Sequence, residues 1–127
     1  MKSNAGLWID HREAVIVVLR GSGEEIRRIP SAAARQHAAE MPPDDLRQKE
    51  FTEHLTRYYD EVIAHLRDVG SILIFGPGEA KGELKKRFET HKSEDRPITV
   101  ETTDNMTAPQ IAARVREHFE PAARRAA

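Results

Sequence analysis

The sequence predicts an α/β fold in which helices cover both faces of a mixed β-sheet. Ile72–Phe75 is apolar at every position, which is typical of a strand buried on both faces in the middle of a sheet. Before it, Asp45–Val69 repeats apolar residues at steps of three and four, as a helix with one buried face does. After it, Gly76-Pro77-Gly78 is a turn signal that leads into a second amphipathic helix.

The first part of the chain predicts three antiparallel strands. Leu7–Ile9 and Ala14–Leu19 are strand candidates on β-branched content, and Asp10-His11-Arg12 between them has the length of a tight hairpin turn. A glycine-rich turn at 21–23 then leads into Glu24–Ile29, where isoleucines are mixed with charged residues. That mixture suits an edge strand protected from pairing with other chains. Pro30–Pro43 has no usable period and is expected to be a surface loop.

The first helix has clear expected ends. Asp45 is the expected N-cap, with Gln48 three residues later, and Gly70 is expected to end the helix as a left-handed C′ glycine. Its apolar stripe consists of Phe51, Leu55, Tyr58, Val62, Leu66 and Val69.

The remaining elements are a second helix, a strand and a third helix. Leu84 and Phe88, four residues apart, share one face of the second helix. Ile98–Thr102 alternates apolar and polar residues, as a half-covered strand does. Thr107 is the expected N-cap of the last helix, with Gln110 at the capping-box position. The expected inner stripe of this helix is Ala108, Ala112, Val115 and Phe119.

The predicted element order is β-β-β-α-β-α-β-α. Parallel strands need right-handed helical crossovers, and the burial patterns place the second, first and fourth strands inside the sheet. The strand order 3-2-1-4-5 satisfies these constraints, and it is the order of the ribonuclease H-like architecture. The length of 127 residues predicts one domain, with residues 120–127 as a frayed tail.

Composition excludes several classes of function. The 20 Lys and Arg residues nearly cancel the 21 Asp and Glu residues, so any nucleic-acid contact would be local. The absence of cysteine excludes disulfides and thiolate chemistry, which fits a reducing compartment. With neither a signal peptide nor an apolar stretch of membrane-spanning length, we expect a cytoplasmic protein without a membrane partner.

Three stretches, taken in order, resemble a known family. They are LWIDHREAVIVVLRGSGEEIRRIP, YYDEVIAHLRDVGSILIFGPGEAKGELKKRF and VETTDNMTAPQIAARV. They resemble the middle domain of archaeal and eukaryotic peptide-chain release factors and of the ribosome-rescue factor Pelota. The most specific part is Gly76-Pro77-Gly78 with Lys81, which is similar to the Gly-Pro-Gly-Phe-x-Lys segment of those proteins. The resemblance is strongest to stand-alone bacterial relatives of this domain, described as translational-machinery components.

The chain departs from release factors where their chemistry resides. Release factors carry a Gly-Gly-Gln tripeptide in the loop after the third strand, whereas residues 31–37 here read SAAARQH. Peptidyl-tRNA hydrolysis is therefore not implied by the resemblance. Pelota also lacks the tripeptide, so ribosome contact remains open.

The Gly76–Lys81 turn is the principal candidate site. A turn here would place the N-terminus of a helix at the carboxyl end of a central strand, so Gly76, Gly78 and Lys81 could bind a phosphate, a nucleotide or an RNA backbone. Alternatively, the glycines only allow close backbone approach in a tight turn. Arg35, in the preceding loop, is a further candidate for anion or RNA binding. A Walker loop is excluded because no Gly-Lys-Ser/Thr follows.

Enzymatic and metal sites have little support in the sequence. Asp10 is the only acid at the end of an inner strand, and one acid cannot hold the two metal ions of a nuclease, so Asp10 is expected to be a turn residue. The histidines lack the spacing of a zinc site, and Glu61 and His65 suit a solvated helical pair. We expect neither a catalytic residue nor a cofactor. A basic strip could be formed by Lys85-Lys86-Arg87 and the arginines at 12, 20, 27 and 28, but interleaved acids favour ordinary solvated faces.

Two functions remain open at this point. The first is a non-enzymatic, translation-associated domain that contacts the ribosome or RNA through the Pro30–Asp45 loop and the Gly76–Lys81 turn. The second is a protein–protein or self-associating module, such as a homodimer, that uses the edge strand Glu24–Ile29 or an exposed helix face.

Overall fold

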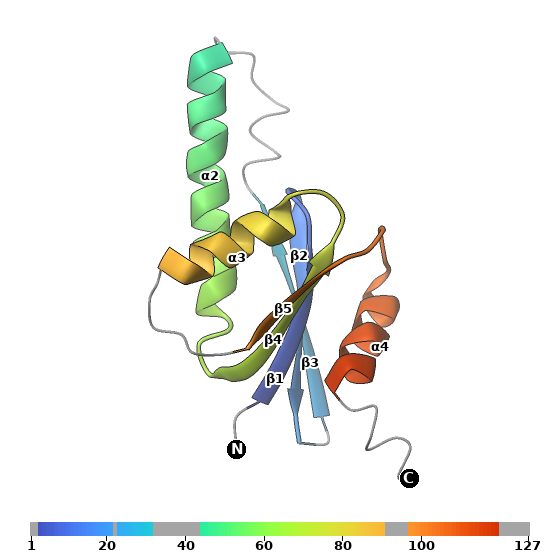
Figure 1. Ribbon diagram of the computed structural model, residues 1–127. Coiled ribbons are helices and arrows are strands. Elements are labelled where there is room, and N and C mark those ends of the chain that lie inside the picture. The colour runs from blue at the N-terminus through green and yellow to red at the C-terminus, as the bar shows by residue number, and fades with distance from the viewer. Residues whose placement is uncertain (1–2, 22, 32–43, 91–96, 120–127) are drawn as a thin grey trace.

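The computed structural model describes residues 3–21, 23–31, 44–90 and 97–119 and has three layers, with a sheet between helices (Figure 1). The elements are β1 (Ser3–Ile9), β2 (Glu13–Arg20), β3 (Gly23–Pro30), α2 (Asp44–Ala64), β4 (Val69–Gly76), α3 (Ala80–Thr90), β5 (Ile98–Thr102) and α4 (Ala108–Phe119). The strand order is β3-β2-β1-β4-β5. The predicted fold class, element order and strand order are confirmed.

The sheet is mixed, and its centre is β1. This strand pairs antiparallel with β2 and parallel with β4, while β5 adds parallel to β4 and β3 adds antiparallel to β2. The strands β1, β3, β4 and β5 therefore all end at one edge of the sheet, which we call the carboxyl edge. The opposite edge, where these four strands begin, is the amino edge.

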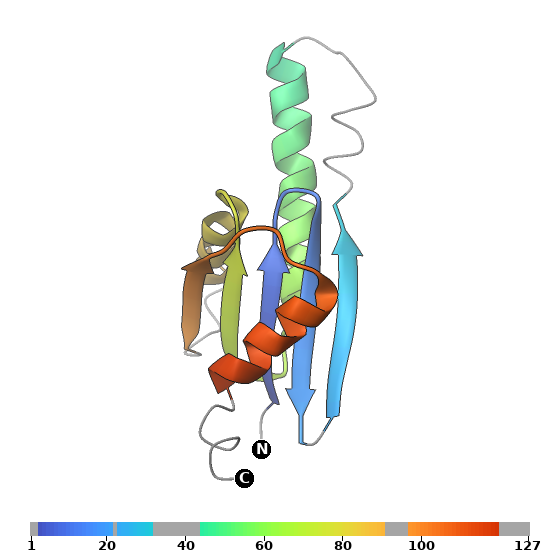
Figure 2. The same ribbon diagram turned by 90° about the vertical axis from the view of Figure 1, so that its right-hand side faces the viewer.

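Two apolar cores fill the spaces between the layers. Helices α2 and α3 cover one face of the sheet and α4 covers the other (Figure 2). Under α2 and α3, the core includes Leu7, Ile16, Val62, Ile74, Leu84 and Phe88. Under α4, it includes Trp8, Val17, Leu73, Phe75, Ile111 and Val115. Successive residues of β1, β2 and β4 alternate between the two cores, which explains why these strands are apolar at consecutive positions.

Helix α4 lies close against the centre of the sheet. An ideal Cβ atom at Gly6 would lie 2.5 Å from Cγ2 of Val115, so the missing side chain of Gly6 makes room for the helix. The predicted capping box is confirmed, because the Gln110 amide donates to Oγ1 of Thr107 and the Thr107 amide donates to Oε1 of Gln110. The expected inner stripe omitted Ile111, which is buried, and included Ala108 and Phe119, which are only half-buried.

The predicted end of α2 is wrong. The helix ends at Ala64, and Val69 and Gly70 belong to β4, where Val69 pairs with Ser3 of β1. Apolar periodicity misplaced the end of the helix because Leu66, in the connection, and Val69, in β4, are both buried, as they would be in a helix. Gly70 is also not among the glycines with positive φ, so it is no left-handed cap.

The hairpin between β1 and β2 forms as expected. Asp10 Oδ1 accepts hydrogen bonds from the amides of Arg12 at 2.8 Å and Glu13 at 2.9 Å. Asp10 is therefore a turn residue that satisfies its own backbone. No helix in the described part of the chain is both long and apolar enough to span a membrane.

Candidate binding site at the carboxyl edge

The carboxyl edge carries the Gly76–Lys81 turn and the point at which the chain leaves β3. Strand β3 ends at Pro30, and the amide of the buried Ser31 donates to the carbonyl of Arg12 in the β1–β2 hairpin at 2.7 Å. The turn after β4 leaves the same edge, and α2 projects beyond it (Figure 1). The loop between β3 and α2, including Arg35, lies outside the described residues.

Gly76 allows β4 to approach β1 at this edge. Its φ is 148°, and an ideal Cβ atom would lie 2.3 Å from the carbonyl oxygen of Ile9. Its own carbonyl accepts a hydrogen bond from the Thr103 amide at 3.1 Å, which ties the turn to the end of β5. Gly76 is therefore required by the packing of the strands.

Gly78 shapes the remainder of the turn. Its φ is 68°, and nothing lies within 4 Å of an ideal Cβ atom at this position. A glycine is favoured here because the backbone is left-handed, a conformation that other residues rarely adopt, and not because a side chain would clash. Glu79 directly precedes α3 (Ala80–Thr90), and its carbonyl accepts from the amides of Gly82 and Glu83 in the first turn.

Lys81 points back onto the turn. Its ammonium donates to the carbonyl of Gly78, so the predicted cation lies beside the predicted glycines. A cavity of about 470 Å³ opens here, and it is lined by Gly78, Glu79, Lys81, Gly82, Glu83, Lys86 and Val100. The structure brings three of the four predicted site residues together, but two glutamates balance the two lysines.

Glu83 connects this cavity to a second one between α2 and α3. The Tyr59 hydroxyl donates to Oε1 of Glu83 at 2.5 Å, and Nε2 of His11 lies 3.1 Å from the same oxygen. Burial, followed by this hydrogen bond, raises the pKa of the Tyr59 phenol well above its ordinary value. Tyr59 is therefore a protonated donor at neutral pH.

The second cavity has a volume of about 450 Å³. It is lined by His11, Thr52, Leu55, Thr56, Tyr59, Glu79, Glu83, Lys86, Arg87 and Thr90. Beside it, Arg87 makes a two-point ion pair with Asp60, with N–O distances of 2.6 and 3.0 Å, which raises the pKa of Arg87. The two helices are thus joined by Tyr59–Glu83 and by Asp60–Arg87.

Sequence reasoning missed the cluster of His11, Tyr59 and Glu83. Of these three residues, only Tyr59 is indicated by the local sequence, because it stands four residues after Leu55 and four before the buried Ile63 on one helix face. Its stripe was overlooked because the neighbouring stripe through Tyr58 is also apolar. Within the described residues, no group of three or more His, Cys, Asp or Glu side chains is arranged to hold a metal ion.

Two solved structures share this architecture. Pelota of Thermoplasma acidophilum aligns with 97% of this chain at a TM-score of 0.59 and 14% identity. Pelota of Archaeoglobus fulgidus aligns with 98% at a TM-score of 0.55 and 18% identity. The chain has a Pelota-like fold. It spans about a third of each of those chains, 34% and 37% respectively.

The Pelota-like fold is what these comparisons establish. An archaeal translation termination factor, aRF1, aligns with 98% of this chain at 13% identity, but its TM-score of 0.44 is too low to support a detailed comparison. No protein-family profile matches the chain. No curated protein matches its sequence.

Proposed function

We propose that this chain is a non-enzymatic, translation-associated domain that contacts the ribosome or its RNA through the carboxyl edge. The observation that carries the proposal is the Pelota-like fold, which extends over 97% of the chain. The family resemblance of the sequence links that fold to ribosome rescue and to peptide release.

The geometry of the carboxyl edge suits a contact surface. The Gly76–Lys81 turn and the end of β3 lie at the same edge, and α2 extends past it (Figure 1). Lys81 and Lys86 line an open cavity there, where they could meet phosphates of an RNA backbone. Arg35 belongs to this surface in the proposal because its loop starts at the same edge.

The absence of catalysis is part of the proposal. Residues 31–37 contain no glycine, so the loop after β3 lacks the tripeptide of release factors. Glu83, which lines both cavities, accepts a hydrogen bond from Tyr59 and contacts His11, and these contacts join α3 to α2 and to the β1–β2 hairpin.

Sedimentation of a tagged chain in cell lysate tests this function. We expect co-migration with ribosomal particles at low salt and release at high salt, because contacts to phosphates weaken as salt rises. A chain that stays at the top of the gradient at every salt concentration would contradict the proposal.

A second candidate function is self-association through the edge strand β3. Ile26 lies on this strand and, within the described residues, is the large hydrophobic side chain that is exposed, at 47%. Sedimentation equilibrium of the purified chain separates the two candidates. A dimer that Ile26→Lys dissociates, together with no ribosome association, would favour this second function.

A further inference from the structure

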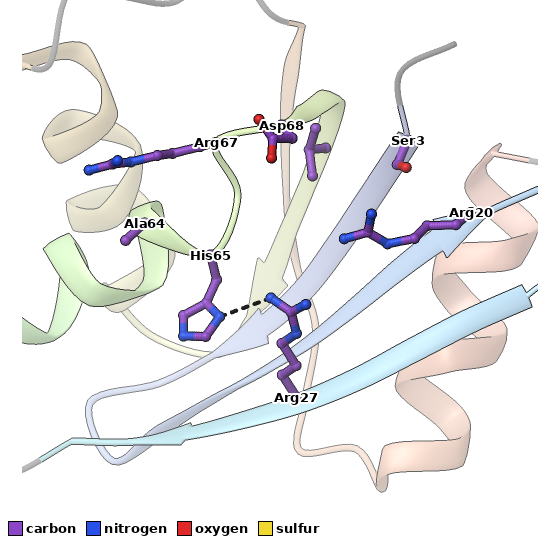
Figure 3. A pocket seen from close by; sticks show the side chains of 8 residues that line it. Ser3, Arg20, Arg27, Ala64, His65, Arg67 and Asp68 are labelled. Carbon is purple, nitrogen blue, oxygen red and sulfur yellow. Dashed lines mark hydrogen bonds between the residues drawn. The ribbon is translucent and has the colours of Figure 1, made fainter.

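A basic pocket lies at the amino edge, far from the site described above. It has a volume of about 570 Å³ and lies beside the end of α2, on the sheet face that α2 covers (Figure 3). Its polar lining consists of Ser3, Arg20, Arg27, His65, Arg67 and Asp68. These residues come from β1, β2, β3 and the connection between α2 and β4.

Strand alternation explains why these side chains share one face. Side chains two residues apart on a strand point to the same side. Ala5, Val18 and Ile29 belong to the core under α2. Ser3, Arg20 and Arg27 each stand two residues from one of these core residues, so they continue the same face beyond the apolar region. Because α2 ends at Ala64, the polar end of this face borders the pocket.

Arg27 and His65 form the centre of the pocket. Nη1 of Arg27 lies 3.0 Å from Nδ1 of His65 (Figure 3). An arginine has only donors, so Nδ1 accepts and Nε2 of His65 carries the ring hydrogen. The imidazole is therefore available as a further donor through Nε2.

The lining of the pocket carries three arginines and one acid, Asp68. Glu25 lies beside the pocket and pairs with Arg27, whose Nε donates to Oε2 of Glu25 at 2.5 Å. Arg20 is 3.7 Å from Glu25, and its side chain is 56% exposed, so this contact is weak and Arg20 can reorient. In Figure 3, Arg67 extends away from Arg20 and Arg27, so those two arginines are the cations that converge on the pocket.

We propose that this pocket binds a phosphate group. The planar guanidinium presents donors that match the oxygens of phosphate, and arginines from two strands can reach one such group together. The neutral His65 and the hydroxyl of Ser3 supply uncharged donors around them. The pocket is separate from the carboxyl edge, so this inference does not rest on the proposed function.

Stabilisation of the end of α2 does not explain the whole cluster. A helix C-terminus attracts cations on its last turn and just beyond it. That effect accounts for His65 and Arg67, which stand one and three residues after Ala64, the last residue of α2. Arg20 and Arg27 come from strands far away in the sequence, and their convergence requires a different reason.

Titration with inorganic phosphate tests the proposal. At constant ionic strength set with chloride, we expect saturable amide shifts at Ser3, Arg20 and His65. Arg27→Gln should weaken phosphate binding by about tenfold or more, as expected for a lost charge-assisted hydrogen bond. Arg20→Gln, at a more exposed position, is the second variant in case Arg27→Gln fails to fold.

Arg28→Gln is the matched control for these variants. Arg28 is on the same strand and carries the same charge, but it contacts Glu13 on the opposite face. We expect it to retain the affinity of the wild-type chain. Equal shifts with phosphate and chloride, wild-type affinity in both pocket variants, or equal weakening by Arg28→Gln would each overturn the proposal.

Two probes distinguish the source of the phosphate. If a short oligouridylate shifts the same amides and competes with inorganic phosphate, the pocket binds the RNA backbone. If only inorganic phosphate binds, the pocket serves small phosphorylated molecules. Both outcomes support a phosphate site, whereas binding of neither probe refutes it.

Discussion

Gly76 packs directly against the backbone of Ile9. The ideal Cβ position at Gly76 is 2.3 Å from the Ile9 carbonyl oxygen, and the φ of 148° disfavours other residues as well. This contact fixes the end of β4 beside the end of β1, where the turn leading to α3 begins. The glycine that marks the turn in the sequence is thus a requirement of the sheet.

Gly76→Ala should destabilise the fold strongly. The clash is with backbone, which cannot move aside cheaply, and the φ adds strain, so we expect a loss of about 3 kcal/mol in the free energy of unfolding. Urea denaturation measures it. Gly82→Ala is the control, because Gly82 lies in α3 with nothing within 4 Å of its Cβ position. It should stabilise the chain by about 0.5–1 kcal/mol. A neutral Gly76→Ala would contradict the close approach.

The two buried tyrosines should make the chain sensitive to alkaline pH. Burial raises the pKa of the Tyr58 and Tyr59 phenols above their ordinary values. The folded state therefore favours the protonated phenols, and their stabilisation is complete below the unfolded pKa of about 10 and is lost as pH rises further. Each tyrosine should lower the free energy of unfolding by up to about 1.4 kcal/mol per pH unit above that value.

Tyr59→Phe separates the two effects of this side chain. At neutral pH the variant loses the hydrogen bond to Glu83, at a cost of about 1–2 kcal/mol. Above pH 10 it should lose stability less steeply than the wild-type chain, because one titrating phenol is gone. Urea denaturation at a series of pH values measures both. An unchanged alkaline slope in Tyr59→Phe and in Tyr58→Phe would contradict the assignment.

Gly6 and Val115 should be energetically coupled. Gly6→Ala alone places a methyl group 2.5 Å from Cγ2 of Val115 and should cost about 1–3 kcal/mol through overpacking. Val115→Ala removes buried methyl groups and should cost about 2 kcal/mol. The double variant should be more stable than the sum of these losses implies, by about 1 kcal/mol. Strict additivity in a double-mutant cycle would show that α4 does not pack on Gly6.

The topology was predictable because burial leaves a strong local signal. The runs in β2 and β4 are apolar at consecutive positions, while the edge strands β3 and β5 are mixed or alternating. Those patterns, with the handedness of crossovers, leave one strand order. The end of α2 was not predictable in this way, because Val69 would be buried in a helix as well as in a strand. Only its pairing with Ser3 assigns it to β4.

The candidate sites also differ in whether their residues are close together in the sequence. The Gly76–Lys81 turn is one local segment, so its residues could be found together in the sequence. His11 and Glu83 are 72 residues apart, and Tyr59 and Glu83 are 24 apart, so only the fold brings them into contact. Arg27 and Arg28 look like one basic strip in the sequence, but alternation sends them to opposite faces of β3, where they contact His65 and Glu13 respectively.

Binding to purified ribosomes tests the central claim, that the carboxyl edge is the contact surface, most directly. The double variant Lys81→Gln/Lys86→Gln removes the two cations that line the cavity at this edge, whereas Lys85→Gln removes an exposed cation of the same helix that does not line it. The account predicts saturable binding of the wild-type chain, about tenfold weaker binding of the double variant and unchanged binding of the control. Absence of binding, or equal weakening of binding by Lys85→Gln and by the double variant, would contradict it.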